Sequence, residues 1–270
     1  MRTDRTWTGS INSDADNPGN WSPRGAPRPG NTLSMTQGVI DIAGNDLAGD
    51  TLSVSGISGS VEIDTREAAK LDLSTMGTIP VNVHVDGVLK LTAQVNGFFG
   101  EHVDFSGGTI RFIGTSTFRG SHTVFDGSLV GSATINVFHG ANGTGASEFM
   151  EIDGSVGRRL TFNFESGGPP QTLQLDDPSE FHGTISLPPT LVGAVAFVGI
   201  HATRADLRDD ILRLFDGNKL VDKFRLNGGN AGLNLEQNSL GVMLTQGASD
   251  VFQPGGPGTT IPLHLPLHIS

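Results

Sequence analysis

The sequence predicts an all-β protein whose strands stack as the coils of a right-handed parallel β-helix. Between residues 36 and 138, apolar and polar residues alternate in short runs such as Val81-Asn-Val-His-Val85. This alternation is typical of strands with one buried face. Glycine or an Asx-Gly corner interrupts the runs every few residues, so the strands are shorter and more frequent than in a β-sandwich. Short strands joined by tight corners favour a solenoid, in which successive coils bury one continuous apolar ladder.

The composition limits the kinds of partner that the chain can bind. Glycine accounts for 38 and proline for 14 of the 270 residues, so the fold needs many turns. The net charge of −11 argues against nucleic acids and anionic membranes, because phosphate binding needs clustered Lys and Arg. Cysteine is absent, which excludes disulfides, thiolate metal sites and cysteine nucleophiles. We therefore expect no nucleic-acid partner and no membrane insertion.

No targeting segment is evident in the sequence. Residues 1–7 lack the apolar core of a signal peptide. The most apolar run, Leu191–Ile200, is too short to cross a bilayer. We expect a soluble protein that is made and assembled in the cytoplasm.

Residues 1–30 are expected to form an N-terminal cap. Trp7 and Trp21 are the only tryptophans, and a run of prolines follows them at positions 23, 27 and 29. The first coil of a solenoid needs a cover, because an open coil pairs with the edge of another chain. The two indole rings can supply this cover.

Residues 31–168 are expected to form the β-helix. Phenylalanine recurs along this segment, and stacked aromatic side chains inside the solenoid explain the recurrence most simply; an exposed sugar-binding strip is the alternative. The residues concerned are Phe98, Phe99, Phe105, Phe112, Phe118, Phe125 and Phe138. Gly167-Gly-Pro-Pro170 is the clearest internal break.

Residues 171–247 are expected to form either a β-rich C-terminal domain or the final coils with larger excursions. Within this segment, residues 203–215 fit a helical stripe as well as a strand. Ile211–Phe215, Asp216-Gly-Asn218 and Lys219–Leu226 fit a hairpin better, and we predict the hairpin.

Residues 248–270 are expected to form an extended C-terminal arm. Apolar residues occupy every second position, namely Ile261, Leu263, Leu265, Leu267 and Ile269. Pro262 and Pro266 confine this strand to a sheet edge. We predict that the arm binds a neighbouring subunit; folding back on its own domain is the alternative.

Catalytic and metal-binding patterns are weak. Glycoside hydrolysis needs two carboxylates at a fixed separation, yet adjacent pairs such as Asp176-Asp177 and Asp209-Asp210 place their side chains on opposite faces of a strand. Carboxylates on different coils, for instance Glu62, Asp64 and Asp104, remain an open combination. We predict a protein that is not an enzyme.

No cofactor or metal site is predicted. His264 and His268 lie four residues apart, but the prolines between and beside them forbid a helix that would bring them together. Asp14-Ala-Asp16 lacks the glycine and glutamate of a calcium loop.

Two groups of segments carry a resemblance to a known class of protein. Near the N-terminus these are Trp7-Thr-Gly9, Gly19-Asn-Trp21-Ser-Pro23, Gly25-Ala-Pro27 and Gly30-Asn-Thr32. In the last third they are Leu173-Gln-Leu-Asp176, Phe181-His-Gly-Thr-Ile185, Gly199-Ile-His-Ala-Thr203 and Ile211–Gly217. They resemble the β-helical passenger repeats of bacterial autotransporter-type surface proteins, although Asn31 stands where that family commonly has Asp. The resemblance implies a β-helix and an outward-facing role, and it carries no catalytic residues.

Together these observations predict a non-enzymatic structural protein on the surface of a large assembly. A bacteriophage virion is our first choice, with the protein as a capsid decoration, spike or fibre component. It would be a homo-oligomer such as a trimer, joined to a neighbouring structural protein through the arm, with surface glycans as a further partner. An adhesin passenger on the bacterial surface or secreted from the cell is the alternative, and a tailspike-type polysaccharide depolymerase is the second.

Overall fold

The computed structural model divides into two compact units, Met1–Ile135 (the first unit) and Asn136–Ser270 (the second unit). The structure describes residues 4–28, 31–35, 37–43, 51–55, 61–71, 73–76, 81–91, 102–118, 122–137, 148–166, 170–228, 232–246 and 259–264. Nearly all of its regular structure is β-strand, so the predicted all-β class is confirmed.

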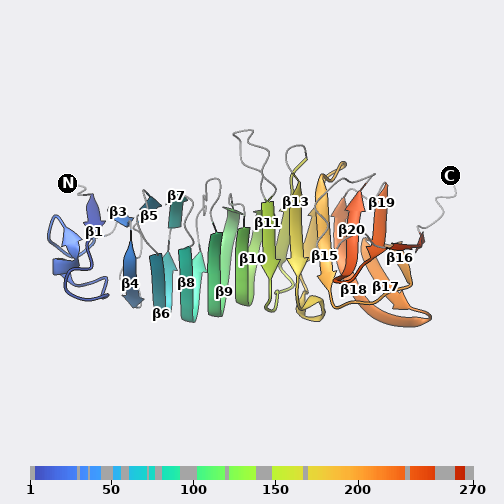
Figure 1. Cartoon of the computed structure of the whole chain (residues 1–270), viewed down its shortest axis with the longest axis horizontal. Helices are drawn as coiled ribbons and strands as arrows, with labels where there is room; N and C mark the ends of the chain where they lie inside the picture. The colour runs from blue at the N-terminus through green and yellow to red at the C-terminus, as the bar shows by residue number, and fades with distance from the viewer. Residues whose placement is uncertain are drawn as a thin grey trace. The chain divides into compact units, whose positions relative to one another are not determined.

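Strands β1 to β10 come in chain order from the cap through the first unit (Figure 1). Their bounds are β1 Arg5–Trp7, β2 Trp21–Ser22, β3 Thr32–Met35, β4 Gly38–Ala43, β5 Thr51–Ser55, β6 Val61–Leu71, β7 Leu73–Met76, β8 Val81–Leu91, β9 His102–Phe118 and β10 His122–Val137. A short 3₁₀ helix, η1 (Pro18–Asn20), precedes β2.

Two parallel ladders show that this chain winds as a solenoid. One ladder joins β1, β3, β5 and β7, and the other joins β4, β6, β8 and β9. Between β3 and β9, paired residues lie 19 to 23 positions apart, which is the length of one coil. The predicted parallel β-solenoid is therefore confirmed, with about three turns; its right-handedness stays a prediction.

The register places apolar residues of successive coils in line. Ile40, Ile63, Val83 and Phe105 occupy one such row. At its two ends, Ile40 and Phe105 have no exposed surface. Repetition of one inward position from coil to coil is what a solenoid core requires.

Phenylalanines stack inside the first unit, as the sequence predicts. Phe105, Phe112 and Phe125 are fully buried. The rings of Phe105 and Phe125 are 5.1 Å apart at an angle of 15°, and Phe112 meets Phe125 edge-on at 5.9 Å. Such pairs stabilise a core beyond the area they bury. Phe98, Phe99 and Phe138 lie outside the described residues.

The second unit contains β11 to β22 and the 3₁₀ helix η2 (Pro178–Glu180). The strand bounds are β11 Glu148–Ile152, β12 Leu160–Phe164, β13 Gln171–Leu175, β14 Thr184–Leu187, β15 Gly193–Val198, β16 Arg204–Arg208, β17 Ile211–Asp216, β18 Lys219–Gly228, β19 Leu233–Gln237, β20 Gly241–Gln246, β21 Thr259–Ile261 and β22 Leu263–His264.

Parallel coils open the second unit. Strand β11 pairs with β13 and β13 with β15, while β12 pairs with β14. The coil repeat is 22 or 23 residues here. Parallel pairing thus continues across Gly167–Pro170, of which residues 167–169 lie outside the described residues.

Antiparallel strands close the second unit. Strand β20 pairs antiparallel with β15, and β19 pairs antiparallel with β20. The ladder of β14 continues only at β18, 41 positions later, because β15, β16 and β17 lie between them in the chain. Residues 171–247 therefore begin as coils and end as an antiparallel sheet.

The predicted hairpin is confirmed as β17 and β18, and a further strand, β16, precedes it. Strand β16 pairs with β17 around Asp209 and Asp210, whose φ angles are 52° and 58°. Positive φ at both positions of a two-residue turn is typical of hairpins. Strand β17 then pairs with β18 from Asp216 and Lys219 onward.

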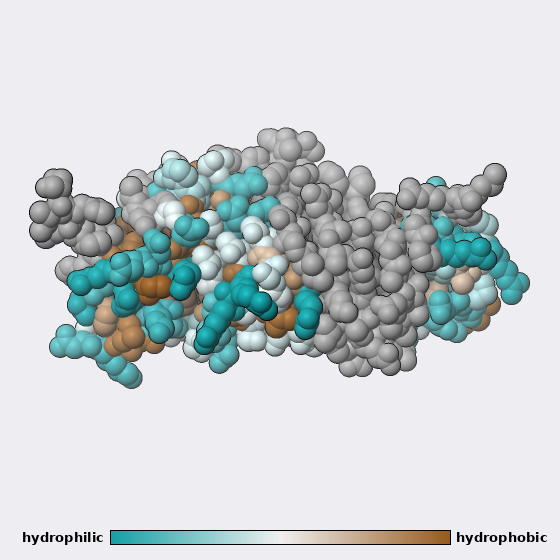
Figure 2. All heavy atoms as spheres, turned by 180° about the vertical axis from the view of Figure 1, so that it is seen from behind, coloured by the Kyte–Doolittle hydropathy of each residue, from teal (hydrophilic) through white to brown (hydrophobic). Residues whose placement is uncertain are grey.

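Few large apolar side chains are exposed in the described part of the chain. They are Ile11, Val39, Leu220 and Val221. Figure 2 shows hydrophilic side chains interspersed with hydrophobic ones on the face that it displays. The two helices in the described part of the chain are three-residue 3₁₀ turns, and neither is long enough to span a membrane.

Candidate functional site

Both cap tryptophans are buried where the cap meets the first coil. Trp7 is 4% and Trp21 3% exposed, and their rings pack edge-to-face with centroids 5.0 Å apart. Trp7 ends β1, which pairs antiparallel with β2 and parallel with β3. A second bridge joins Asp14 to Asp41 on β4. The cap thus extends both ladders of the first unit.

A buried asparagine organises the cap loop between the tryptophans. Asn20 has no exposed surface. Its Oδ1 accepts hydrogen bonds from the backbone N–H groups of Ile11 and Asn12, at 3.0 and 3.2 Å. Its Nδ2 donates to Asn12 Oδ1 at 2.6 Å and to the carbonyl of Asp14 at 2.9 Å. One side chain therefore satisfies four groups of an irregular loop, as buried polar atoms require.

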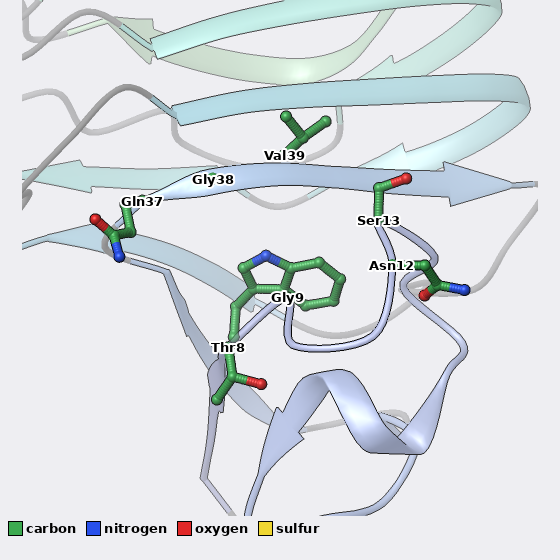
Figure 3. A pocket seen from close by; sticks show the side chains of 8 residues that line it. Thr8, Gly9, Asn12, Ser13, Gln37, Gly38 and Val39 are labelled. Carbon is green, nitrogen blue, oxygen red and sulfur yellow. The ribbon is translucent and has the colours of Figure 1, made fainter.

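A pocket of about 430 Å³ lies between this loop and the start of β4 (Figure 3). Its volume falls within the usual range of small-molecule sites, roughly 300–1,000 Å³. The cap contributes Trp7, Thr8, Gly9, Asn12 and Ser13, and the opposite wall is formed by Gln37, Gly38 and Val39. None of these eight described residues is charged, so the pocket presents hydroxyl and amide groups around an indole ring.

Three carboxylates meet on the second unit. One oxygen from each of Glu151, Asp153 and Asp176 lies within 4.8 Å of the others. Glu151 and Asp176 point outward because the alternating residues Ile152 and Leu175 fill the core. Gln174 links them, since its Nε2 donates to Asp176 Oδ1 at 2.9 Å and to Glu151 Oε1 at 3.4 Å. Oxygen clusters of this kind are the ligands that hard cations such as Ca²⁺ prefer.

The carboxylate cluster perturbs the protonation of one member. Burial raises the pKa of Asp176 above its ordinary value of 3.8, and the nearby Glu151 raises it further. The side-chain hydrogen bonds that Asp176 shares with Asp153 and Gln174 lower its pKa and oppose this rise. Burial likewise raises the pKa of Asp222, although the backbone N–H of Lys223 partly opposes the rise.

The sequence analysis missed this cluster, although a signal for it exists. Strands β11 and β13 pair with a 23-residue repeat, and Asp153 and Asp176 are separated by that same interval. Equivalent positions on successive coils lie side by side. The sequence also left open a group of carboxylates on different coils. Its members are Glu62, Asp64 and Asp104, whose side chains lie outside the described ones.

The first part of the predicted C-terminal arm pairs within its own unit. Strand β21 pairs antiparallel with β19, which places Ile261 opposite Leu235 with 3% of its surface exposed. Strand β22 pairs with β16, and the N–H of Ala205 donates to the carbonyl of Pro262 at 3.0 Å. Leu265, Leu267 and Ile269 lie outside the described residues, and binding of a neighbour by the arm stays a prediction.

Comparison with protein-family models, with curated proteins and with solved structures finds no match for this chain. The autotransporter-like resemblance thus rests on the sequence segments and on the solenoid alone.

Proposed function

We propose that this protein is a non-enzymatic structural component on the surface of a large assembly. In its most specific form, the proposal is a bacteriophage virion protein that decorates a capsid or forms part of a spike or fibre. The protein would act as a homo-oligomer such as a trimer. The resemblance to autotransporter-type passengers supports an outward-facing role, and an adhesin passenger is the alternative within the same architecture.

The observation that carries this proposal is the parallel β-solenoid with covered strand edges. The stacked coils are held together by parallel strand pairing along both ladders of the first unit. In the first unit the cap adds β1 to the ladder of β3, and in the second unit β20 covers the edge of β15. Covered edges prevent uncontrolled strand pairing. We therefore expect neighbouring subunits to be bound by specific segments, such as the predicted C-terminal arm.

Truncation tests the oligomeric part of this proposal. We expect a chain ending at His264 to remain folded but to lose its trimeric mass in size-exclusion chromatography with light scattering. A deletion of residues 255–270 is the matched comparison, because it also removes the buried Ile261 and should lower stability as well. An unchanged oligomeric mass in the chain ending at His264 would contradict a role of the arm in assembly.

Two further experiments test the location and the absence of activity. Electron microscopy of particles from the native source, labelled with gold-conjugated antibody, should show the protein on a particle surface. Incubation with capsular polysaccharide should release no reducing ends. If reducing ends are released, and if the Asp176→Asn variant no longer releases them, the protein is a depolymerase and the structural proposal is overturned.

A further inference from the structure

The side chain of Trp7 is buried, and its indole N–H has no partner among the residues that the structure describes. Trp21 Nε1 donates to the carbonyl of Ala15 at 2.8 Å. Trp7, although its side chain is just as buried, has no acceptor for its Nε1–H in the part of the chain that the structure describes. Buried tryptophans usually find such an acceptor. Of the two rings, Trp7 is therefore the one whose N–H is available to a ligand.

The unpaired N–H faces the pocket. A Cβ built on Gly9 would lie 3.2 Å from Trp7 Nε1, and one built on Gly38 would lie 3.8 Å away. Both glycines line the pocket. Trp7 itself also lines the pocket. Glycine at both positions keeps the approach to Nε1 open.

Other groups around the pocket are neutral and rich in donors. Figure 3 shows Asn12 and Ser13 on one side and Gln37 on the other. Asn12 Oδ1 is occupied by bonds from Asp14 N, Asn17 Nδ2 and Asn20 Nδ2. This geometry fixes the amide of Asn12 and leaves its Nδ2 as the group that can donate to a ligand. With Ser13 Oγ and Trp7 Nε1, the cap offers three donors to the pocket.

These features favour a neutral ligand that carries many acceptor oxygens. No described lining residue is a carboxylate, which disfavours a metal ion. None is Lys or Arg either, and the chain is strongly acidic, so phosphate esters are disfavoured. Sugar hydroxyl and ring oxygens match amide, hydroxyl and indole donors. A volume of about 430 Å³ accommodates one or two sugar rings.

We propose that this pocket binds a neutral saccharide unit, with Trp7 Nε1–H donating to a hydroxyl or ring oxygen. Asn12 and Ser13 then bond the neighbouring hydroxyls. The proposal concerns the first unit alone and stands independently of the assembly role.

The two indole N–H groups provide a direct test by nuclear magnetic resonance. A ¹⁵N-labelled chain gives two indole cross-peaks, which Trp7→Phe and Trp21→Phe assign. A panel of glucose, galactose, mannose, N-acetylglucosamine, lactose and maltose is then titrated. We expect at least one sugar to shift the Trp7 cross-peak while the Trp21 cross-peak stays in place. The proposal is overturned if no sugar of the panel shifts the Trp7 peak, or if only acidic sugars do.

Two variants test the role of the cap residues in binding. Trp7→Phe removes the donor and should weaken saccharide affinity at least about tenfold, and the unchanged Trp21 cross-peak checks that the cap is folded. Ser13→Ala should weaken affinity about fivefold, equivalent to one neutral hydrogen bond. Ser10→Ala is the matched control, because Ser10 Oγ donates to the carbonyl of Gly19 in the same loop and does not line the pocket. Unchanged affinity in Trp7→Phe overturns the proposal.

Discussion

The two units build the same kind of parallel ladder, but each covers the edge of its ladder in a different way. In the first unit, an irregular loop is held by the side chain of Asn20 and by the packed pair Trp7 and Trp21. In the second unit, the strand at the end of the ladder, β15, is covered by β20, which bonds backbone to backbone. The cover of the first unit therefore depends on a few side chains, and the cover of the second unit depends on a regular ladder. Single substitutions should destabilise the two covers to different extents.

Substitution of a closely packed glycine should destabilise the ladders of both units to a similar extent, and this is the largest effect that we expect. A Cβ at Gly131 in the first unit would lie 2.1 Å from the carbonyl oxygen of Phe112, and one at Gly193 in the second unit would lie 1.9 Å from that of Gln171. We expect Gly131→Ala and Gly193→Ala each to lower the free energy of unfolding by about 3–4 kcal/mol, because the backbone of the neighbouring coil must move.

Gly199→Ala is the control for these two substitutions. Gly199 also has positive φ, but its added Cβ would meet no atom within 4 Å. The expected loss is about 1 kcal/mol from backbone strain alone. Urea denaturation followed by circular dichroism measures all three variants. Equal losses at Gly193 and Gly199 would show that close contact between coils does not limit side-chain size there.

The caps should differ more than the ladders. Asn20→Ala leaves the N–H groups of Ile11 and Asn12 without their acceptor, and we expect a loss of about 3 kcal/mol. Gln237 plays the corresponding role in the second unit, where it accepts from Ala202 N at 2.9 Å and donates to the carbonyls of Ile200 and Gly241. Gln237→Ala should lose only about 1–2 kcal/mol, because this half-buried site admits water and the sheet remains.

Tryptophan fluorescence distinguishes the two units in this experiment. Both tryptophans of the chain belong to the first unit. Asn20→Ala should therefore shift the fluorescence transition to lower urea more than the transition seen by circular dichroism. Gln237→Ala should do the reverse. A larger loss for Gln237→Ala than for Asn20→Ala would contradict the view that the side-chain-held cap is the more vulnerable end.

Within the cap, the two rings should respond differently to the same substitution. Trp21→Phe leaves the carbonyl of Ala15 unpaired and should cost about 1–2 kcal/mol more than Trp7→Phe. Both substitutions remove a similar ring area, so the difference isolates the hydrogen bond. Thermal unfolding measures both variants without added sugar. Equal losses would show that Trp7 Nε1–H has a partner of its own in the folded protein.

The sequence predicts the repeating part of this fold better than its ends. Alternation and glycine corners are local signals, and stacking Phe105, Phe112 and Phe125 needs only that each points inward. The antiparallel pairing of β20 with β15 joins residues more than 40 positions apart, and no local pattern specifies it. The loop role of Asn20 also escapes prediction, because its bonds go to backbone groups that any residue provides.

The carboxylate cluster shows a different limit. Coil length varies between 19 and 23 residues along the described ladders. A change of one residue in the assumed repeat moves every side chain to the opposite face. Asp153 and Asp176 can therefore be matched only once the local repeat is known, whereas the hairpin turn at Asp216-Gly-Asn218 follows from adjacent residues.

The smallest expected effect concerns that cluster, which belongs to the regular ladder of the second unit. Because the pKa of Asp176 is raised in the folded state, the folded protein holds this proton at a pH where the unfolded chain has released it. The free energy of unfolding therefore falls as pH rises from 3.8 through the folded pKa, and it stays lower above that pKa. Asp176→Asn removes this cost and keeps an oxygen for Gln174.

We expect Asp176→Asn to be more stable than the natural chain at pH 7, by less than about 1 kcal/mol, and equally stable below the ordinary pKa of the carboxyl. Thermal unfolding at both pH values measures the difference, with the exposed Glu180→Gln as the matched control. Salt should reduce the difference only in part, because burial, which is the first cause of the raised pKa, is not screened. A less stable Asp176→Asn at pH 7 would mean that the ionised carboxylate stabilises the ladder, and the cluster would then differ in kind from the side-chain network of the cap.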